Sequence, residues 1–150
     1  MTLQLDPRHV AAIRRHGEAD YPAEACGLIG GMIDEGEGGR KVAVHLVPLA
    51  NQRTDAARNR YLIDPDAFRR AQEKLDRDGL EVLGVYHSHP DHPPTPSAFD
   101  RAHAWPWLSY VIVGVARGRS GELASWVLAD DRGAFDVEPL VIEEGNAVWQ

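Results

Sequence analysis

Short apolar stretches along the chain predict most of its secondary structure. From Val42 to Leu49 apolar and polar side chains alternate, which is the period of a strand with one buried face. From Leu108 to Val115 nearly every residue is apolar and many are β-branched, as in a central strand buried on both faces. We expect strands over residues 25–33, 42–49, 61–63, 80–89, 108–115, 123–128 and 134–137.

Two Asp-Pro pairs, at residues 6–7 and 64–65, mark the starts of two helices. Aspartate caps a helix N-terminus well, and proline fits the first helical position because its fixed φ suits a helix. The first helix is expected to end between Gly17 and Pro22, and the second near Gly79. A short third helix is expected over residues 97–104.

This order of elements indicates an α+β fold with a mixed β-sheet and helices packed on it. Strands outnumber helices, hairpins gather towards the C-terminal end, and helices interrupt the early strands. The glycine-rich stretch 35–39 is expected to form a hairpin tip, and the tail is expected to fray after Ile142. Residues 1–150 show no repeat and no linker, so we expect a single domain.

Composition narrows the classes of partner. The chain is 43% hydrophobic and 26% charged, which is ordinary for a soluble domain. Its formal net charge of −7 argues against nucleic acid as a partner. No apolar run approaches the ~18 residues that a membrane helix needs, and the N-terminus lacks the features of a signal peptide, so we expect a cytoplasmic protein without a membrane partner.

The chemistry concentrates at the end of the predicted strand 80–89. His87 and His89 are two residues apart, so they point to the same face of that strand, and Pro90 then ends it. Asp100 follows and can supply an oxygen ligand. Two histidines and one carboxylate are a ligand set that holds a catalytic zinc with one position open. Each part has a structural alternative, since single histidines are usually packing residues and Ser97-x-x-Asp100 is also a helix capping box. The combination favours a metal site.

The sequence resembles the signature of the JAMM (MPN-plus) metallopeptidases at four places: Glu24, the stretch His87-Ser88-His89-Pro90, Ser97 and Asp100. The resemblance extends over roughly residues 10–142. It implies a cytidine deaminase-like arrangement in three layers and one zinc per chain. It also implies hydrolysis of peptide or isopeptide bonds next to the C-terminus of ubiquitin-like proteins.

The resemblance assigns the catalytic roles. Glu24 would be the general base, although by itself it reads as a surface carboxylate. Ser97 would donate to an oxyanion, and it can cap the third helix as well. Ser88 is expected to face away from the histidines and to be structural.

Other histidines, the cysteine and the tryptophans are expected to lie outside the catalytic machinery. We expect His92 to be solvated, and His103 to be a surface residue or an auxiliary partner of the site. Cys26, the single cysteine, cannot form an internal disulfide and is expected to be a buried small hydrophobe. The tryptophans Trp105, Trp107 and Trp126 are expected in the core.

The same residues exclude one rival function and leave others open. A zinc nucleoside deaminase needs a Pro-Cys-x-x-Cys pair, which a chain with Cys26 alone cannot supply. A RadC-like protein, a non-catalytic MPN scaffold and a deubiquitinase-like isopeptidase on other ubiquitin-like conjugates stay as alternatives. The short spans 47–61 and 112–126 make the chain most similar to compact bacterial members. The resemblance to these members, which act on sulfur-carrier proteins, implies cleavage after the C-terminal Gly-Gly of a small β-grasp sulfur carrier, with the leaving group and the oligomeric state left open.

Overall fold

The computed structural model describes residues 1–36, 38–51 and 63–144. Its elements are, in chain order, β1 (Thr2–Leu5), α1 (Pro7–Asp20), β2 (Cys26–Asp34), β3 (Arg40–Leu49), α2 (Pro65–Arg77), β4 (Glu81–Pro90), α3 (Ala98–His103), β5 (Ser109–Ala116), β6 (Arg119–Leu128), β7 (Phe135–Glu138) and β8 (Leu140–Ile142). The strands form one mixed sheet in the order β7-β6-β5-β4-β2-β3-β1-β8. The expected α+β class is confirmed.

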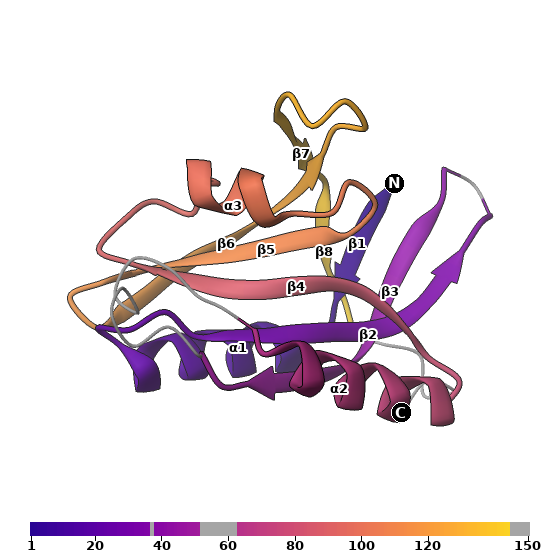
Figure 1. The fold of residues 1–150 in the computed structure, drawn as a ribbon, viewed down its shortest axis with the longest axis horizontal. Helices are drawn as coiled ribbons and strands as arrows, with labels where there is room; N and C mark the ends of the chain where they lie inside the picture. Colours follow the sequence, from indigo (N-terminus) through magenta and orange to yellow (C-terminus); the bar gives the residue numbers. More distant parts are fainter. Residues whose placement is uncertain (37, 52–62, 145–150) are drawn as a thin grey trace.

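Helices cover both faces of this sheet (Figure 1). Successive side chains of β4 point to opposite faces, so Tyr86 packs with Val10 and Ile13 of α1, whereas Val85 packs with Ala71 of α2. The second cluster also holds Ala104, which directly follows α3. The three-layer arrangement implied by the resemblance is therefore present, with α2 and α3 on the face opposite α1.

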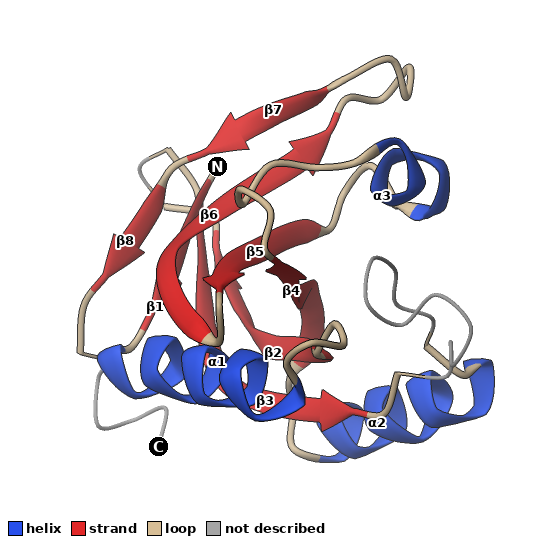
Figure 2. Cartoon of the chain, turned by 90° about the vertical axis from the view of Figure 1, so that its left-hand side faces the viewer, coloured by secondary structure: helices blue, strands red, loops and turns tan. Residues whose placement is uncertain are grey.

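The two edge strands of the sheet are consecutive in the chain. β7 ends at Glu138 and β8 begins at Leu140, so Pro139 alone joins opposite edges of the sheet. Figure 2 shows how the strands curl to allow this. Inside the curl, the ammonium of Lys41 on β3 donates to Ser109 Oγ at 2.7 Å and contacts Glu138 Oε2 at 3.2 Å. A buried ion pair therefore ties together strands from distant places in the sheet.

The start signals read from the sequence are confirmed. Asp6 and Asp64 cap α1 and α2, each with a proline in the first turn. The end of α1 also lies where it was expected: the helix runs through Gly17 and ends at Asp20, before Pro22. Gly17 lies inside the helix, where a β-carbon would be 3.1 Å from Val115 and 3.3 Å from Ser88. Glycine allows α1 to approach the sheet closely there, and it does not end the helix.

Two strands were not predicted. β1 and β8 are short, and they pair with each other in parallel, with Leu3 opposite Leu140. The expected strand 61–63 falls mostly outside the described residues, and so does the expected fraying of the tail beyond residue 144. Among the described residues, no helix is long and apolar enough to cross a membrane.

Candidate metal centre

Four side chains from three separate segments of the sequence meet at the end of β4. Val85, His87 and His89 share one face of this strand by its two-residue period. The pairing of β2 with β4 sets Cys26 opposite His87, which places the preceding Glu24 beside the histidines. On the other side, Asp100 projects from the first turn of α3.

The side-chain atoms of these residues converge. The Nε2 atoms of His87 and His89 lie 3.2 Å apart, and each is close to one oxygen of Asp100, at 3.3 Å for His87 and 3.2 Å for His89. Glu24 Oε1 lies 4.0 Å from His89 Nε2. All four side chains are buried, so the structure brings together the three predicted ligands and the predicted base.

The tautomer of His89 is set by its neighbours. Its Nδ1 lies 2.9 Å from the carbonyl oxygen of Pro93, which can only accept, so Nδ1 carries the proton. The Nε2 lone pair then points to the centre of the cluster. Fixing an imidazole through its far nitrogen in this way is common among metal-binding histidines.

Charge at the site is unbalanced without a cation. Burial, and after it the charge of Asp100, raise the pKa of Glu24 to about 8. Burial also lowers the pKa of His87. For Asp100 burial acts upwards, but its contacts with the imidazole rings of His87 and His89 and with the Ser97 N–H outweigh it and hold the pKa well below its usual range. Two imidazoles beside an ionised carboxylate are a donor set that suits a divalent cation.

A buried oxygen of Glu24 also indicates that the site suits a cation. Glu24 Oε2 is buried and has no hydrogen-bond partner among the described residues. An unsatisfied buried carboxylate oxygen is costly, so it indicates a group that completes the site. Glu24, His87 and His89 also bring one ligand atom each within 4.8 Å of one another.

Ser97 lies at the N-terminus of α3 and closes a capping box. Its Oγ accepts the Asp100 backbone N–H at 3.0 Å, and its own N–H donates to Asp100 Oδ2 at 2.8 Å. The cap uses a lone pair of the hydroxyl and leaves the O–H donor available. Capping therefore does not exclude a second role for Ser97.

The remaining candidates lie outside this cluster. Ser88 accepts the Ala25 N–H at 2.8 Å behind the site, as expected for a structural residue. Cys26 is fully buried, and burial raises the pKa of its thiol to about 12. His92 is exposed, and His103 is exposed and bonded to the carbonyl oxygen of Phe99 at 2.9 Å.

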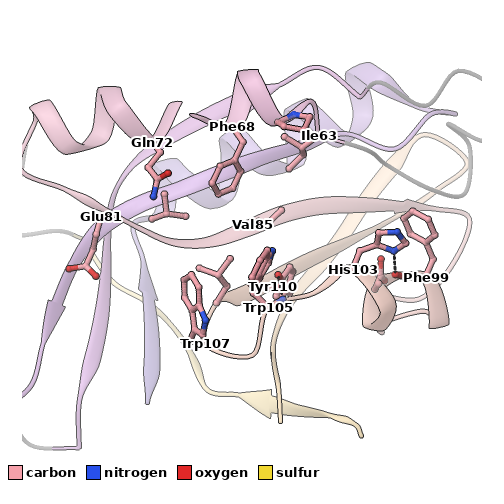
Figure 3. Close-up of a pocket in the computed structure, with 14 residues that line it drawn as sticks. Ile63, Phe68, Gln72, Glu81, Val85, Phe99, His103, Trp105, Trp107 and Tyr110 are labelled. Carbon is pink, nitrogen blue, oxygen red and sulfur yellow. Dashed lines mark hydrogen bonds between the residues drawn. The ribbon is translucent and has the colours of Figure 1, made fainter. Parts of the chain in front are cut away.

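An apolar pocket of about 670 Å³ adjoins the cluster, with Asp100 in its wall. It lies between α2, α3 and the strands β4 and β5, and Figure 3 shows Phe68 of α2 across from Trp105 and Trp107. The expectation that these two tryptophans belong to the core is wrong, because they are 60% and 67% exposed. They flank Pro106 in a segment without helical or strand period, a signal of a surface loop.

Comparisons with known proteins agree on one family. Residues 6–129 match the family described as prokaryotic homologs of the JAB domain. The desampylase of Haloferax volcanii is 37% identical over 116 residues, or 75% of this chain and 78% of that protein. A probable TtuB-protein conjugate cleaving protease of Thermus thermophilus is 36% identical over 101 residues, which are 67% of this chain and 62% of that protein.

Solved structures give the same fold. A solution structure of a protein from Desulfitobacterium hafniense superposes with a TM-score of 0.83 at 28% identity, covering 98% of this chain and 97% of that one. A second, from Salinibacter ruber, has a TM-score of 0.72 at 37% identity and covers 98% and 94%.

Proposed function

Because the chain belongs to the family of prokaryotic JAB-domain homologs and is a JAMM-type hydrolase, we propose that it is a zinc-dependent peptidase that cleaves after the C-terminal Gly-Gly of a small ubiquitin-like sulfur carrier. The observation that carries the proposal is the convergence of His87, His89 and Asp100, with Glu24 beside them. The named relatives support the coarser substrate class, conjugates of small ubiquitin-like proteins, since one is called a desampylase and another a protease that cleaves TtuB-protein conjugates.

His87, His89 and Asp100 would hold the ion. When bound, Zn²⁺ supplies a Lewis acid that brings the pKa of a bound water towards ~7. Every other part of the chemistry falls to side chains of the protein.

Glu24 is the proton carrier in this proposal. General acid–base catalysis first requires a group within reach of the reacting water, and Glu24 Oε1 lies 4.0 Å from His89 Nε2 at the edge of the cluster. Its carboxylate takes a proton from the attacking water and returns it to the departing amine. The buried Oε2 atom, which has no partner among the described residues, is available for this exchange.

Ser97 stabilises the negative charge that develops on the substrate carbonyl oxygen. Its hydroxyl is fixed in place because it accepts the Asp100 N–H at 3.0 Å, and a fixed donor needs no reorganisation during the reaction. The same residue thus orients the helix of Asp100 and presents an O–H towards the reacting bond.

The apolar pocket suits the segment of substrate before the cleaved bond. A Gly-Gly pair has no side chains, so it can pass through a narrow approach beside Asp100. Apolar side chains before the glycines could then rest against Phe68, Trp105 and Trp107. Main-chain hydrogen bonds would add affinity for such an extended tail.

An isopeptidase that releases ubiquitin-like proteins from lysine side chains is the second candidate, favoured by the names of the relatives. Mass spectrometry distinguishes the two. Carriers extended by a peptide or a cysteine, and lysine-linked conjugates, are incubated with the zinc-loaded enzyme and with Glu24→Gln. A mass loss that ends at Gly-Gly, stopped by a chelator, supports the first proposal. If extended carriers stay intact while lysine conjugates or unrelated peptides are cut, the sulfur-carrier proposal is wrong.

A further inference from the structure

Arg132 lies far from the metal centre in sequence but contacts the helix that carries Asp100. It sits in the turn between β6 and β7, with a φ of 62° in the left-handed region. Its guanidinium donates to the carbonyl oxygens of Ala104 at 2.8 Å, Arg101 at 3.1 Å and Ala102 at 3.4 Å. In the opposite direction, the guanidinium of Arg101 donates to the carbonyl oxygen of Gly133 at 3.2 Å.

These hydrogen bonds reach the C-terminal end of α3, where the helix has the least support of its own. The helix has six residues, too few to be stable alone, and the carbonyl groups at its end have no partners within the helix. A guanidinium there supplies donors to three of them, and its positive charge is favourable at a helix C-terminus. Ser97 fixes the other end of α3 through the capping box. Asp100 therefore lies on a helix that is held at both ends, by Ser97 and by Arg132.

The turn that carries Arg132 is itself held in shape. The Arg132 N–H donates to the carbonyl oxygen of Ala129 at 2.8 Å, and the Gly133 N–H donates to Asp131 Oδ1 at 2.8 Å. A left-handed φ at a residue with a side chain costs energy, and surrounding contacts must maintain it. The strained residue is the one whose side chain reaches α3.

We propose that Arg132 is a positioning residue for the Asp100 carboxylate, acting through the C-terminal end of α3. The proposal rests on the proposed role of Asp100 as a metal ligand. It predicts that loss of the guanidinium lets the helix shift and loosens the carboxylate from the point that His87 and His89 define. Arg132 itself is not among the residues proposed to hold the metal or to contact the substrate.

The test measures binding of the metal alone. The dissociation constant of Zn²⁺ is determined by competition with a chelator, and the absorption spectrum of bound Co²⁺ reports the coordination geometry. Removing a group that orients a ligand typically weakens metal binding by about 10–100-fold, and we expect this loss and an altered Co²⁺ spectrum in Arg132→Ala. Arg132→Lys keeps a cation with fewer donor directions and should lose less.

Arg40→Ala is the matched control. Arg40 also hydrogen-bonds through its guanidinium, to Gln4 Oε1 at 2.8 Å, but on β3 and away from α3. Its loss should leave the Zn²⁺ affinity and the Co²⁺ spectrum of the wild type. Equal losses in Arg40→Ala and Arg132→Ala would mean that only general stability changed, and would overturn the proposal.

A double variant separates this proposal from the proposed function. If Arg132 acts through Asp100, Arg132→Ala should weaken Zn²⁺ binding no further in the Asp100→Ala background. The role of Arg132 is contradicted if the losses of Zn²⁺ affinity in the two single variants add up in the double variant. It is also contradicted if Arg132→Ala binds Zn²⁺ as tightly as the wild type. Either result leaves the ligand assignment intact. Wild-type affinity in Asp100→Ala contradicts the ligand assignment and with it both proposals.

Discussion

His87 and His89 hold their Nε2 atoms 3.2 Å apart in a buried site. The proton of His89 is on Nδ1, bonded to Pro93, so its Nε2 is an acceptor. An acceptor aimed at the point where His87 and Asp100 also converge indicates a shared cation.

The first prediction concerns this pair. Zinc analysis should find one ion per wild-type chain and none in His87→Ala/His89→Ala. Because metal binds the folded state, a chelator should lower the melting temperature of the wild type and leave that of the double variant unchanged. Stoichiometric zinc in the double variant would rule out these ligands.

The second prediction separates a base from a ligand. Glu24→Gln should keep its zinc and its fold but lose on the order of 10²–10⁴ in turnover, the usual contribution of general acid–base catalysis. Metal content and kcat are measured on the same preparation. Normal turnover would remove Glu24 from the mechanism, and lost zinc would make it a ligand.

Ser97 is tested by comparing stability with turnover. Loss of a helix cap costs about 1 kcal/mol. Loss of an oxyanion donor costs about 10²–10³ in kcat. We expect both in Ser97→Ala, and recovery of both in Ser97→Thr, which keeps the hydroxyl. A variant with lower stability and unchanged kcat would reduce Ser97 to a cap.

The buried pair Lys41–Glu138 should matter most when it is broken on one side. Lys41→Met leaves the Glu138 carboxylate buried beside Ser125 without its cation, which typically costs about 3–5 kcal/mol. Lys41→Met/Glu138→Leu should recover most of that loss, since a buried pair is often replaceable by apolar residues. Urea denaturation of the three proteins checks this, and equal stability of wild type and Lys41→Met would contradict it.

His9 gives a pH dependence away from the metal centre. Burial lowers its pKa, against the opposing influence of Asp6, and its Nδ1 accepts the Asp6 N–H at 3.2 Å. The unfolded chain therefore binds this proton more readily, with a pKa of about 6.5. The contribution of His9 to stability is complete above that pH and is lost as the pH falls below it. The free energy of unfolding of the wild type should fall more steeply than that of His9→Gln on acidification, and parallel curves would refute this.

Local signals account for what the sequence predicted well. The caps at Asp6, Asp64 and Ser97 depend on bonds within three residues, so spacing alone is enough to find them. The shared face of His87 and His89 follows from the period of a strand.

What was missed depends on contacts between distant segments. β1 is a strand because it pairs with β3 and β8, and β8 pairs with β1 at the edge of the sheet, but neither shows a pattern long enough to recognise. The exposure of Trp105 and Trp107 depends on the packing of the loop that follows α3, and residue type favoured the core instead. No sequence pattern points to Arg132, because its proposed role depends on the carbonyl groups that its side chain contacts only in the folded chain.

The parallel pair of β1 and β8 has a consequence for synthesis on the ribosome. Of the strands that the structure describes, β1 with Leu3 emerges first and β8 with its partner Leu140 emerges last. Until then β1 has a vacant side, where any extended segment of a neighbouring nascent chain could pair. Contacts over such sequence separation also slow folding.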